Sequence, residues 1–297
     1  MNSLTKSPVL SRTSGSLPFN RARYLRAVRS YIPLRFEMIE SSLARRFRAP
    51  THHVLKNRDR LYTALRSAFR YFPTEPFTIA DIGVYPGSLL RLLRAFLSEE
   101  CQFIGIGLMI SDDFRRAMAE SCGAEILTAN LDPRNEQLKG KGYPARIPLD
   151  DRSVDFAFAL EIIEHMVSPV HVLEEAFRIL KPGGHLLITT PNVTRIGNVF
   201  KLLVGRSNFD RLTPIDYWNE DDEWRPHFRE YTLPEIAGLF RRAGFEVVEQ
   251  RQYIGEDTHE NVKSTLQRLI DLAKIPFYIV PHFRGSLLAV GRKPAGP

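Results

Sequence analysis

The stretch IPLDDRSVDFAFALEIIEHMVSPVHVLEEAFRILKPGGHLLITTPN, residues Ile147–Asn192, predicts a complete strand–helix–strand unit. Phe156–Leu160 is a wholly apolar run, which is typical of a parallel strand that is buried on both faces. Apolar residues then recur at helical spacing over Val172–Leu180, and the glycines of Lys181–Gly184 are of the kind that end helices. His185–Thr190 is predicted to be the next strand.

Three ionisable residues, Glu161, Glu164 and His165, follow the first of these predicted strands directly. In open α/β sheets, ligands bind outside the carboxyl ends of the strands. A helix that begins at the strand end would place positions i, i+3 and i+4 on one face, so we expect the three side chains to converge. The sequence therefore predicts a functional site at this corner.

This unit resembles the second half of a class I S-adenosylmethionine-dependent methyltransferase, of the type 11 branch that includes the ubiquinone-biosynthesis O-methyltransferases. The resemblance implies an α/β fold, in which a Rossmann-like, seven-stranded, mostly parallel sheet carries helices on both faces. It covers roughly residues 75–293, and we place the methyltransferase domain at 73–297. The matching segments, in chain order, are Ile79–Gly83, Asp155 with the ExxEH corner, the LKPGG turn, the TPN strand end, His227–Thr232, Ala243–Val248 and Leu287–Arg292.

The loop after the first predicted strand implies a site for S-adenosylmethionine. The family pattern is an acid followed by three alternating glycines, and here Asp81, Gly83 and Gly87 match it while Tyr85 replaces the middle glycine. Glycine permits positive φ and lets backbone amides approach a ligand closely. We expect all four residues to contact the cofactor, with the Tyr85 ring lining the pocket or partly filling it.

A second departure follows the next predicted strand. The family places there an acid that binds both ribose hydroxyls, and this chain has Gly107. Loss of that charge-assisted contact is expected to weaken cofactor binding unless Ser111, Asp112 or Asp113 replaces it. Asp132 is either the residue that meets the adenine or a turn or helix-cap residue. The resemblance also implies that Glu161 touches the cofactor.

The corner and His227 leave three interpretations open. His165 alone can act as a general base, its basicity raised by a neighbouring carboxylate. Alternatively, Glu161, Glu164, His165 and His227 bind a divalent cation (Mg²⁺, Mn²⁺ or Zn²⁺) that lowers the pKa of the attacked hydroxyl. This second arrangement resembles the metal-dependent small-RNA 2′-O-methyltransferases. In the third interpretation, Glu161 contacts the cofactor and the histidines are structural.

The net charge of +7 belongs to the N-terminal region. Residues 1–72 hold 15 Lys and Arg against three acids, whereas residues 73–297 hold 26 against 31, so no DNA binding is expected. We predict a disordered tail over 1–20 and a basic helical extension over 21–72, broken at Pro33 and Pro50. The extension is either a cap over the cofactor pocket or a surface for peripheral contact with an anionic membrane. Organellar targeting is a further alternative. His52 and His53 are expected on its exposed surface rather than in a site.

The remaining features bound the class of protein. Cys101 and Cys122 are the two cysteines, which argues against a disulfide framework and favours a cytoplasmic protein. An acceptor-side insertion is expected at about 193–230, where Trp218 and Trp224 flank an acidic run. Leu266–Phe283 has enough apolar character for a dimer contact or a lipidic acceptor.

These observations predict an enzyme that uses S-adenosylmethionine to O-methylate a hydroxyl of a small molecule, lipid or glycan. The alternative is a catalytically degenerate domain that serves as an interaction or regulatory module, which the replacements at Tyr85 and Gly107 suggest. A third hypothesis is RNA 2′-O-methylation. The oligomeric state is not predicted.

Overall fold

The computed structural model describes residues 19–38, 52–108, 110–134, 142–208, 227–255 and 265–296. Most of the expected N-terminal tail, together with Pro50, Trp218 and Trp224, lies outside these residues. Among the described residues, none of the helices has both the length and the apolar character that a membrane span requires.

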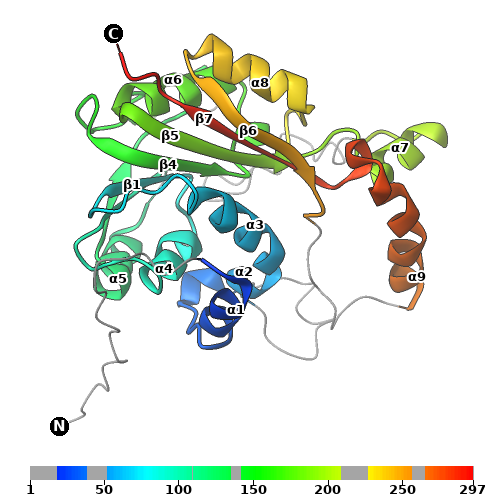
Figure 1. Ribbon diagram of the computed structural model, residues 1–297, viewed down its shortest axis with the longest axis horizontal. Coiled ribbons are helices and arrows are strands. Elements are labelled where there is room, and N and C mark those ends of the chain that lie inside the picture. The colour runs from blue at the N-terminus through cyan, green and yellow to red at the C-terminus, as the bar shows by residue number, and fades with distance from the viewer. Residues whose placement is uncertain are drawn as a thin grey trace.

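A seven-stranded sheet runs through the described chain in the order β3-β2-β1-β4-β5-β7-β6 (Figure 1). All neighbouring pairs are parallel except those of β7, which is antiparallel to both β5 and β6. The predicted mixed, mostly parallel sheet is therefore confirmed. The strands are β1 (Thr78–Ile82), β2 (Gln102–Gly107), β3 (Ala124–Thr128), β4 (Val154–Leu160), β5 (Leu180–Pro191), β6 (Glu246–Tyr253) and β7 (Ser286–Arg292).

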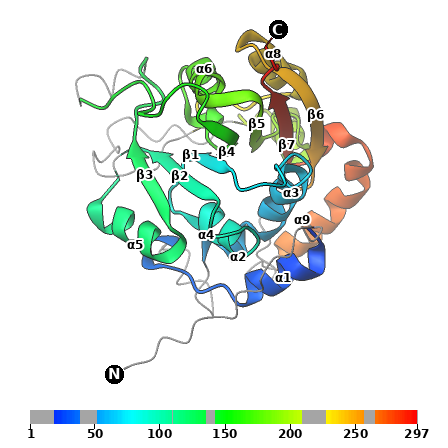
Figure 2. The same cartoon turned by 60° about the vertical axis from the view of Figure 1, so that its left-hand side comes forward.

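Helices cover both faces of the sheet, as the views in Figures 1 and 2 show. The helices of the described residues are α1 (Arg21–Arg29), α2 (His53–Lys56), α3 (Arg58–Ala68), α4 (Ser88–Arg94), α5 (Asp112–Cys122), α6 (Pro169–Ile179), α7 (Ile196–Leu203), α8 (Leu233–Arg242) and α9 (Thr265–Lys274). Short 3₁₀ turns are η1 (Arg35–Glu37), η4 (Ile163–His165), η6 (Ile275–Ile279) and η7 (Pro281–Phe283).

The alternation along β4 explains the two layers. Phe156 and Phe158 pack with residues of α1–α5, and Ala157 and Ala159 pack with residues of α6 and α8. All four side chains are fully buried. Because successive side chains of a strand point to opposite faces, β4 builds both cores at once and holds its carboxyl end, where Glu161 follows, in a fixed position.

Buried polar contacts fasten the N-terminal segment to the domain. The Glu37 carboxylate accepts hydrogen bonds from Ser88 Oγ and the Leu34 amide, each at 2.7 Å, and pairs with Arg91. Glu37 is 1% exposed. Because Ser88 and Arg91 belong to α4, directly after the loop that follows β1, this contact joins the N-terminal segment to that loop.

Candidate active site

A cavity of about 790 Å³ opens at the carboxyl ends of the parallel strands. Its wall includes residues that follow β1, β2, β3 and β4, together with His53 of α2, Arg60 of α3 and Asn57 between these two helices. His53 was expected on an exposed surface, and that expectation is wrong because α2 lies over the pocket. The carboxyl ends of parallel strands meet at one sheet edge, which is why residues so far apart in the chain share one wall.

The glycines after β1 have the geometry that the sequence suggests. Gly83 and Gly87 both have positive φ, at +88° and +93°. A Cβ at Gly83 would lie 2.5 Å from Ile162 Cδ1, so a side chain there would have to displace Ile162 as well as adopt an unfavourable φ. Gly83 lines the cavity, whereas Gly87 is the N-cap of α4 and lies just outside the lining.

Asp81, at the end of β1, lines the cavity and is 4% exposed. Burial raises the pKa of Asp81 to about 7, because the charged carboxylate loses its hydration. A cationic ligand in the cavity would favour the ionised form. The ionisation of Asp81 therefore depends on whether the cavity holds a cationic ligand.

Tyr85 and Gly107 both line the cavity, at the two departures from the family pattern. The Tyr85 ring is 47% exposed and its centroid lies 5.5 Å from that of Phe114. A Cβ at Gly107 would lie 2.7 Å from Ile110 Cδ1. Aromatic and aliphatic side chains thus occupy the region where a ribose-binding acid was expected.

Ser111, Asp112 and Asp113, which could replace the missing ribose-binding acid, differ in their position relative to the cavity. Ser111 lines the cavity, and its hydroxyl accepts a hydrogen bond from the Phe114 amide as the N-cap of α5. Asp112 has a 96% exposed side chain, and Asp113 pairs with Arg35 at 2.6 Å. Neither aspartate is in the cavity wall, so Ser111 alone of the three can reach a ligand there.

Asp132 lines the cavity and also serves as a backbone cap. Its carboxylate accepts hydrogen bonds from the amides of Val167 and Ser168, at 3.1 and 3.0 Å, just before α6 begins at Pro169. The expected turn or helix-cap role and the cavity position are thus compatible. Its carboxylate holds the segment that follows His165.

The corner after β4 differs from the expected helix. Glu161 has φ +55°, η4 spans Ile163–His165, and α6 begins only at Pro169. A non-glycine residue in the left-handed region is unfavourable, and such residues are frequent at functional sites. Glu161 Oε2 pairs with Arg60 Nη1 at 2.9 Å. The expected convergence of Glu161 with the other two ionisable residues on one helical face is therefore wrong.

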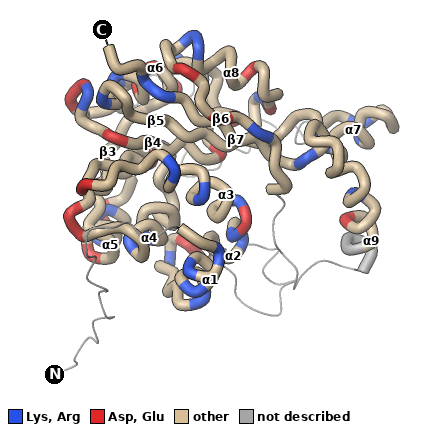
Figure 3. The backbone as a smooth tube through the Cα atoms, viewed as in Figure 1, with Lys and Arg blue, Asp and Glu red and all other residues tan. Residues whose placement is uncertain are grey.

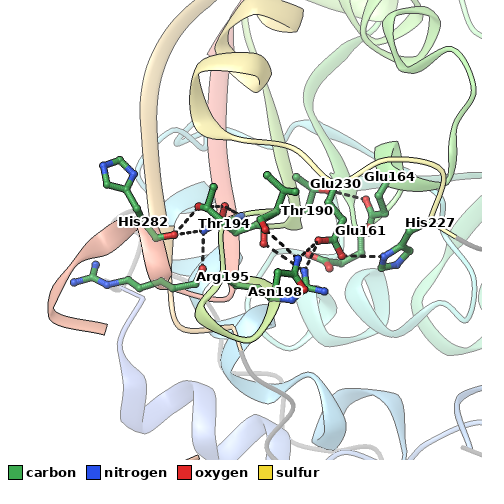
Figure 4. A network of polar contacts seen from close by, with 12 residues as sticks. Glu161, Glu164, Thr190, Thr194, Arg195, Asn198, His227, Glu230 and His282 are labelled. Atoms are coloured by element: carbon green, nitrogen blue, oxygen red, sulfur yellow. Dashed lines mark hydrogen bonds and ion pairs between the residues drawn. The ribbon is translucent and has the colours of Figure 1, made fainter. Parts of the chain in front are cut away.

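Glu164, His165 and His227 do come together. One ligand atom from each lies within 4.8 Å of the others, and the two imidazole centroids are 4.8 Å apart. Figure 4 labels Glu164 and His227 of this group. Phe228 N donates to the Glu164 carbonyl at 2.8 Å, which brings the distant His227 segment to the corner. His165 lines the cavity, so the group reaches the pocket through this side chain.

Glu164 is fully buried within this group. Its Oε2 accepts a hydrogen bond from Thr190 Oγ1 at 2.9 Å. Its Oε1 makes no hydrogen bond among the described residues and lies 3.9 Å from His165 Nε2. Burial, and next the charge of Glu161, raises the pKa of Glu164 well above its ordinary value. A cation beside Oε1 would oppose both effects.

His227 rests on Glu230, whose Oε1 lies 3.4 Å from His227 Nδ1. Glu230 Oε2 accepts hydrogen bonds from Arg195 at 2.7 Å and Asn198 at 2.8 Å (Figure 4). Burial alone would raise the pKa of Glu230, but these partners and His227 lower it below its ordinary value. Glu230 is therefore an anion that orients His227.

Sequence reasoning missed Arg60, Asn57, Thr190 and Glu230. Glu230 lies within the matched segment His227–Thr232, so its spacing of three from the histidine was an available signal. Arg60 and Asn57 belong to the N-terminal helices, where nothing in the sequence separates a cavity-facing arginine from a solvated one.

The sequence model of a family described as a methyltransferase domain matches residues 54–250. The chain belongs to the class I S-adenosylmethionine-dependent methyltransferases. The match begins within α2, so it includes part of the N-terminal region that lines the cavity.

Individual relatives of this methyltransferase match shorter segments. A Mycolicibacterium smegmatis protein, named a probable S-adenosylmethionine-dependent methyltransferase, is 34% identical over 36% of this chain and 34% of its own. A malonyl-[acyl-carrier protein] O-methyltransferase from a Marinomonas species is 33% identical over 45% of each chain. The methyltransferase thus matches less than half the length of either relative.

A solved chain supports the fold. It comes from the complex between the Haloferax volcanii Trm112 methyltransferase activator and a methyltransferase, with TM-score 0.51 and 23% identity. The similarity covers 81% of this chain and 92% of that one.

Proposed function

We propose that this methyltransferase transfers the methyl group of S-adenosylmethionine to a hydroxyl of a small molecule, lipid or glycan. The observation that carries the proposal is the position of His165, which lines the cavity and belongs to the group with Glu164 and His227. A relative named as an O-methyltransferase is in keeping with an oxygen acceptor.

The reaction is an in-line displacement at carbon. The acceptor oxygen forms a bond to the methyl carbon as the bond to sulfur breaks, which gives a methyl ether and S-adenosylhomocysteine. The hydroxyl proton must leave, and we assign His165, which lines the cavity, as the group that takes it. The cavity walls hold donor and acceptor together, which is the larger part of catalysis in such a step.

The residues present also fit a divalent cation. Two imidazoles and a carboxylate supply mixed nitrogen and oxygen ligands, and the buried Glu164 Oε1 makes no hydrogen bond among the described residues. Glu164, His165 and His227 would hold the ion, whereas Glu161 is outside the group. When bound, a cation would lower the pKa of a coordinated hydroxyl.

Activity assays with His165→Ala and His227→Ala, with and without chelator, test the proposal. Loss of activity in chelator, restored by Mg²⁺, Mn²⁺ or Zn²⁺, assigns the group to a cation. Full activity in chelator, with a loss of about 10²-fold or more in His165→Ala, assigns His165 as a base without metal. Unchanged activity in both variants would contradict any role of the group in catalysis.

The competing function is a degenerate domain, which Tyr85 and Gly107 favour because neither supplies a ribose-binding acid. Calorimetry with S-adenosylmethionine and S-adenosylhomocysteine separates the two. Absence of binding of either ligand at millimolar concentration would overturn the enzyme proposal, whether or not Glu164, His165 and His227 (the Glu164 group) bind a cation.

A further inference from the structure

Exposed apolar side chains gather on α7, α9 and η6. Of the eighteen exposed large hydrophobic residues in the described chain, eleven lie within 200–204 and 269–280, which is far more than scattered surface apolar residues would give. Leu203 is 75% exposed and Ile279 is 80% exposed. We call the exposed apolar residues of these two segments the α7–α9 face.

The two segments form one surface. The Phe200 and Phe277 ring centroids lie 5.6 Å apart in an edge-on contact. Asn192 Nδ2 donates to the carbonyls of His282 and Arg284 at 2.8 and 2.7 Å, and this ties the start of α7 to the segment before β7. Figure 1 shows α7 and α9 at the same end of the molecule.

Charge indicates what this face meets. Residues 193–208 and 269–285 hold five Lys and Arg. Arg195 pairs with Glu230 at 2.7 Å on the inner side of α7, and Lys274 pairs with Asp271 at 3.1 Å. The remaining three cations are Lys201, Arg206 and Arg284. Lys201 and Arg206 are exposed beside the apolar side chains of α7, and Figure 3 shows Lys and Arg positions along this part of the chain. Two copies of the face would bring like charges together, whereas anionic lipid headgroups complement them.

The inner side of the same helix supports the catalytic group. Arg195 and Asn198 hold Glu230, which contacts His227, while Leu202 and Leu203 point outward and are exposed. A membrane that contacts the outer side of α7 is therefore separated from the Glu164 group only by α7 and Glu230.

We propose that the α7–α9 face docks the protein on an anionic lipid bilayer, with its apolar side chains in the interfacial layer and its cations on the headgroups. Docking does not depend on the proposed hydroxyl chemistry. It is measured without cofactor, so failure of one proposal leaves the other standing.

The test is co-sedimentation of the full chain with phosphatidylglycerol–phosphatidylcholine vesicles and with phosphatidylcholine vesicles. The double variant Leu203→Glu/Ile279→Glu should bind anionic vesicles about tenfold or more weakly, because it loses apolar insertion and adds repulsion. Ile32→Glu is the matched control. Ile32 is also 80% exposed but lies outside the face, so its replacement should leave binding within about twofold of the unmodified chain. Circular dichroism checks that all variants fold.

Three outcomes would overturn the proposal. The first is no binding of the unmodified chain to anionic vesicles. The second is that Arg26→Glu/Arg29→Glu on α1 loses vesicle binding whereas Leu203→Glu/Ile279→Glu binds fully. The contact would then lie on the N-terminal helices. The third is that the unmodified chain does not bind vesicles but self-associates as its concentration rises, and that Leu203→Glu/Ile279→Glu abolishes this self-association. The face would then be an interface between copies of the chain.

Discussion

Arg60 on α3 pairs with Glu161 at the end of β4, at 2.9 Å between Nη1 and Oε2. The two residues are 101 positions apart and both line the cavity. The pair therefore joins the N-terminal helices to the corner that carries Glu164 and His165. Both side chains are about a quarter exposed or less, so water screens the pair only in part.

Arg60→Met should lower the free energy of unfolding by about 1–2 kcal/mol, because Glu161 is left partly buried without its ion-pair partner. Urea unfolding measures this, and Arg66→Met, an exposed change on the same helix, should stay within about 0.5 kcal/mol of the unmodified chain. In a double-mutant cycle with Glu161→Gln, additivity within about 0.5 kcal/mol would show that the pair contributes nothing.

The sheet could be predicted because its signals are local and repeated. The apolar run of β4, the helical spacing of α6 and the segments matched by family resemblance indicate elements that the described residues contain. Lys181–Gly184, expected as a turn before the strand, instead lie within β5. The family resemblance implies the seven-stranded sheet, and the carboxyl ends of its parallel strands share one edge. The cavity's place at that edge follows from the same reasoning.

The details of the corner could not be predicted in the same way. Glu161 adopts a left-handed backbone conformation, and no neighbouring residue in the sequence indicates this. Ser168-Pro169 could have indicated where the helix begins, because proline favours the first position of a helix. In the structure α6 begins at Pro169, after His165. The contact of Arg60 depends on packing across the whole domain, and no spacing within α3 could indicate it.

The affinity for S-adenosylmethionine should rise between pH 6 and pH 8. Burial holds the pKa of Asp81 at about 7 in the ligand-free protein. Ionised Asp81 attracts the cationic cofactor, and protonated Asp81 does not. Below pH 7 the cofactor must first displace a proton, so the dissociation constant should increase by up to about tenfold from pH 8 to pH 6.

Calorimetry across this range gives the measurement. Asp81→Asn should bind more weakly and with no pH dependence between pH 6 and pH 8. A pH dependence that survives in Asp81→Asn would assign the titration to another group.

Glu230→Gln should lower kcat by about tenfold while leaving the dissociation constant of S-adenosylmethionine unchanged, because Glu230 orients His227 and does not line the cavity. Steady-state kinetics and calorimetry separate the two quantities. Glu235→Gln is the matched control. Glu235 is the third helical residue in the capping box of α8. Glutamine can also hold this position, so Glu235→Gln should leave kcat unchanged and reduce stability by less than about 1 kcal/mol. Equal effects of both variants on kcat would mean that Glu230 is only structural.

Gly107→Asp should strengthen cofactor binding only if Ile110 gives way. A Cβ at position 107 would lie 2.7 Å from Ile110 Cδ1. The double variant Gly107→Asp/Ile110→Ala removes that clash and restores a carboxylate that can accept both ribose hydroxyls.

We expect calorimetry to give about tenfold tighter binding of S-adenosylmethionine for the double variant, and a smaller gain for Gly107→Asp alone. Gly107→Asn/Ile110→Ala has the same shape without the charge, and it should gain little. If the aspartate and asparagine variants bind alike, the ribose does not lie beside position 107. The aromatic wall of Tyr85 and Phe114 would then hold the cofactor in a different position from the one that the family pattern implies.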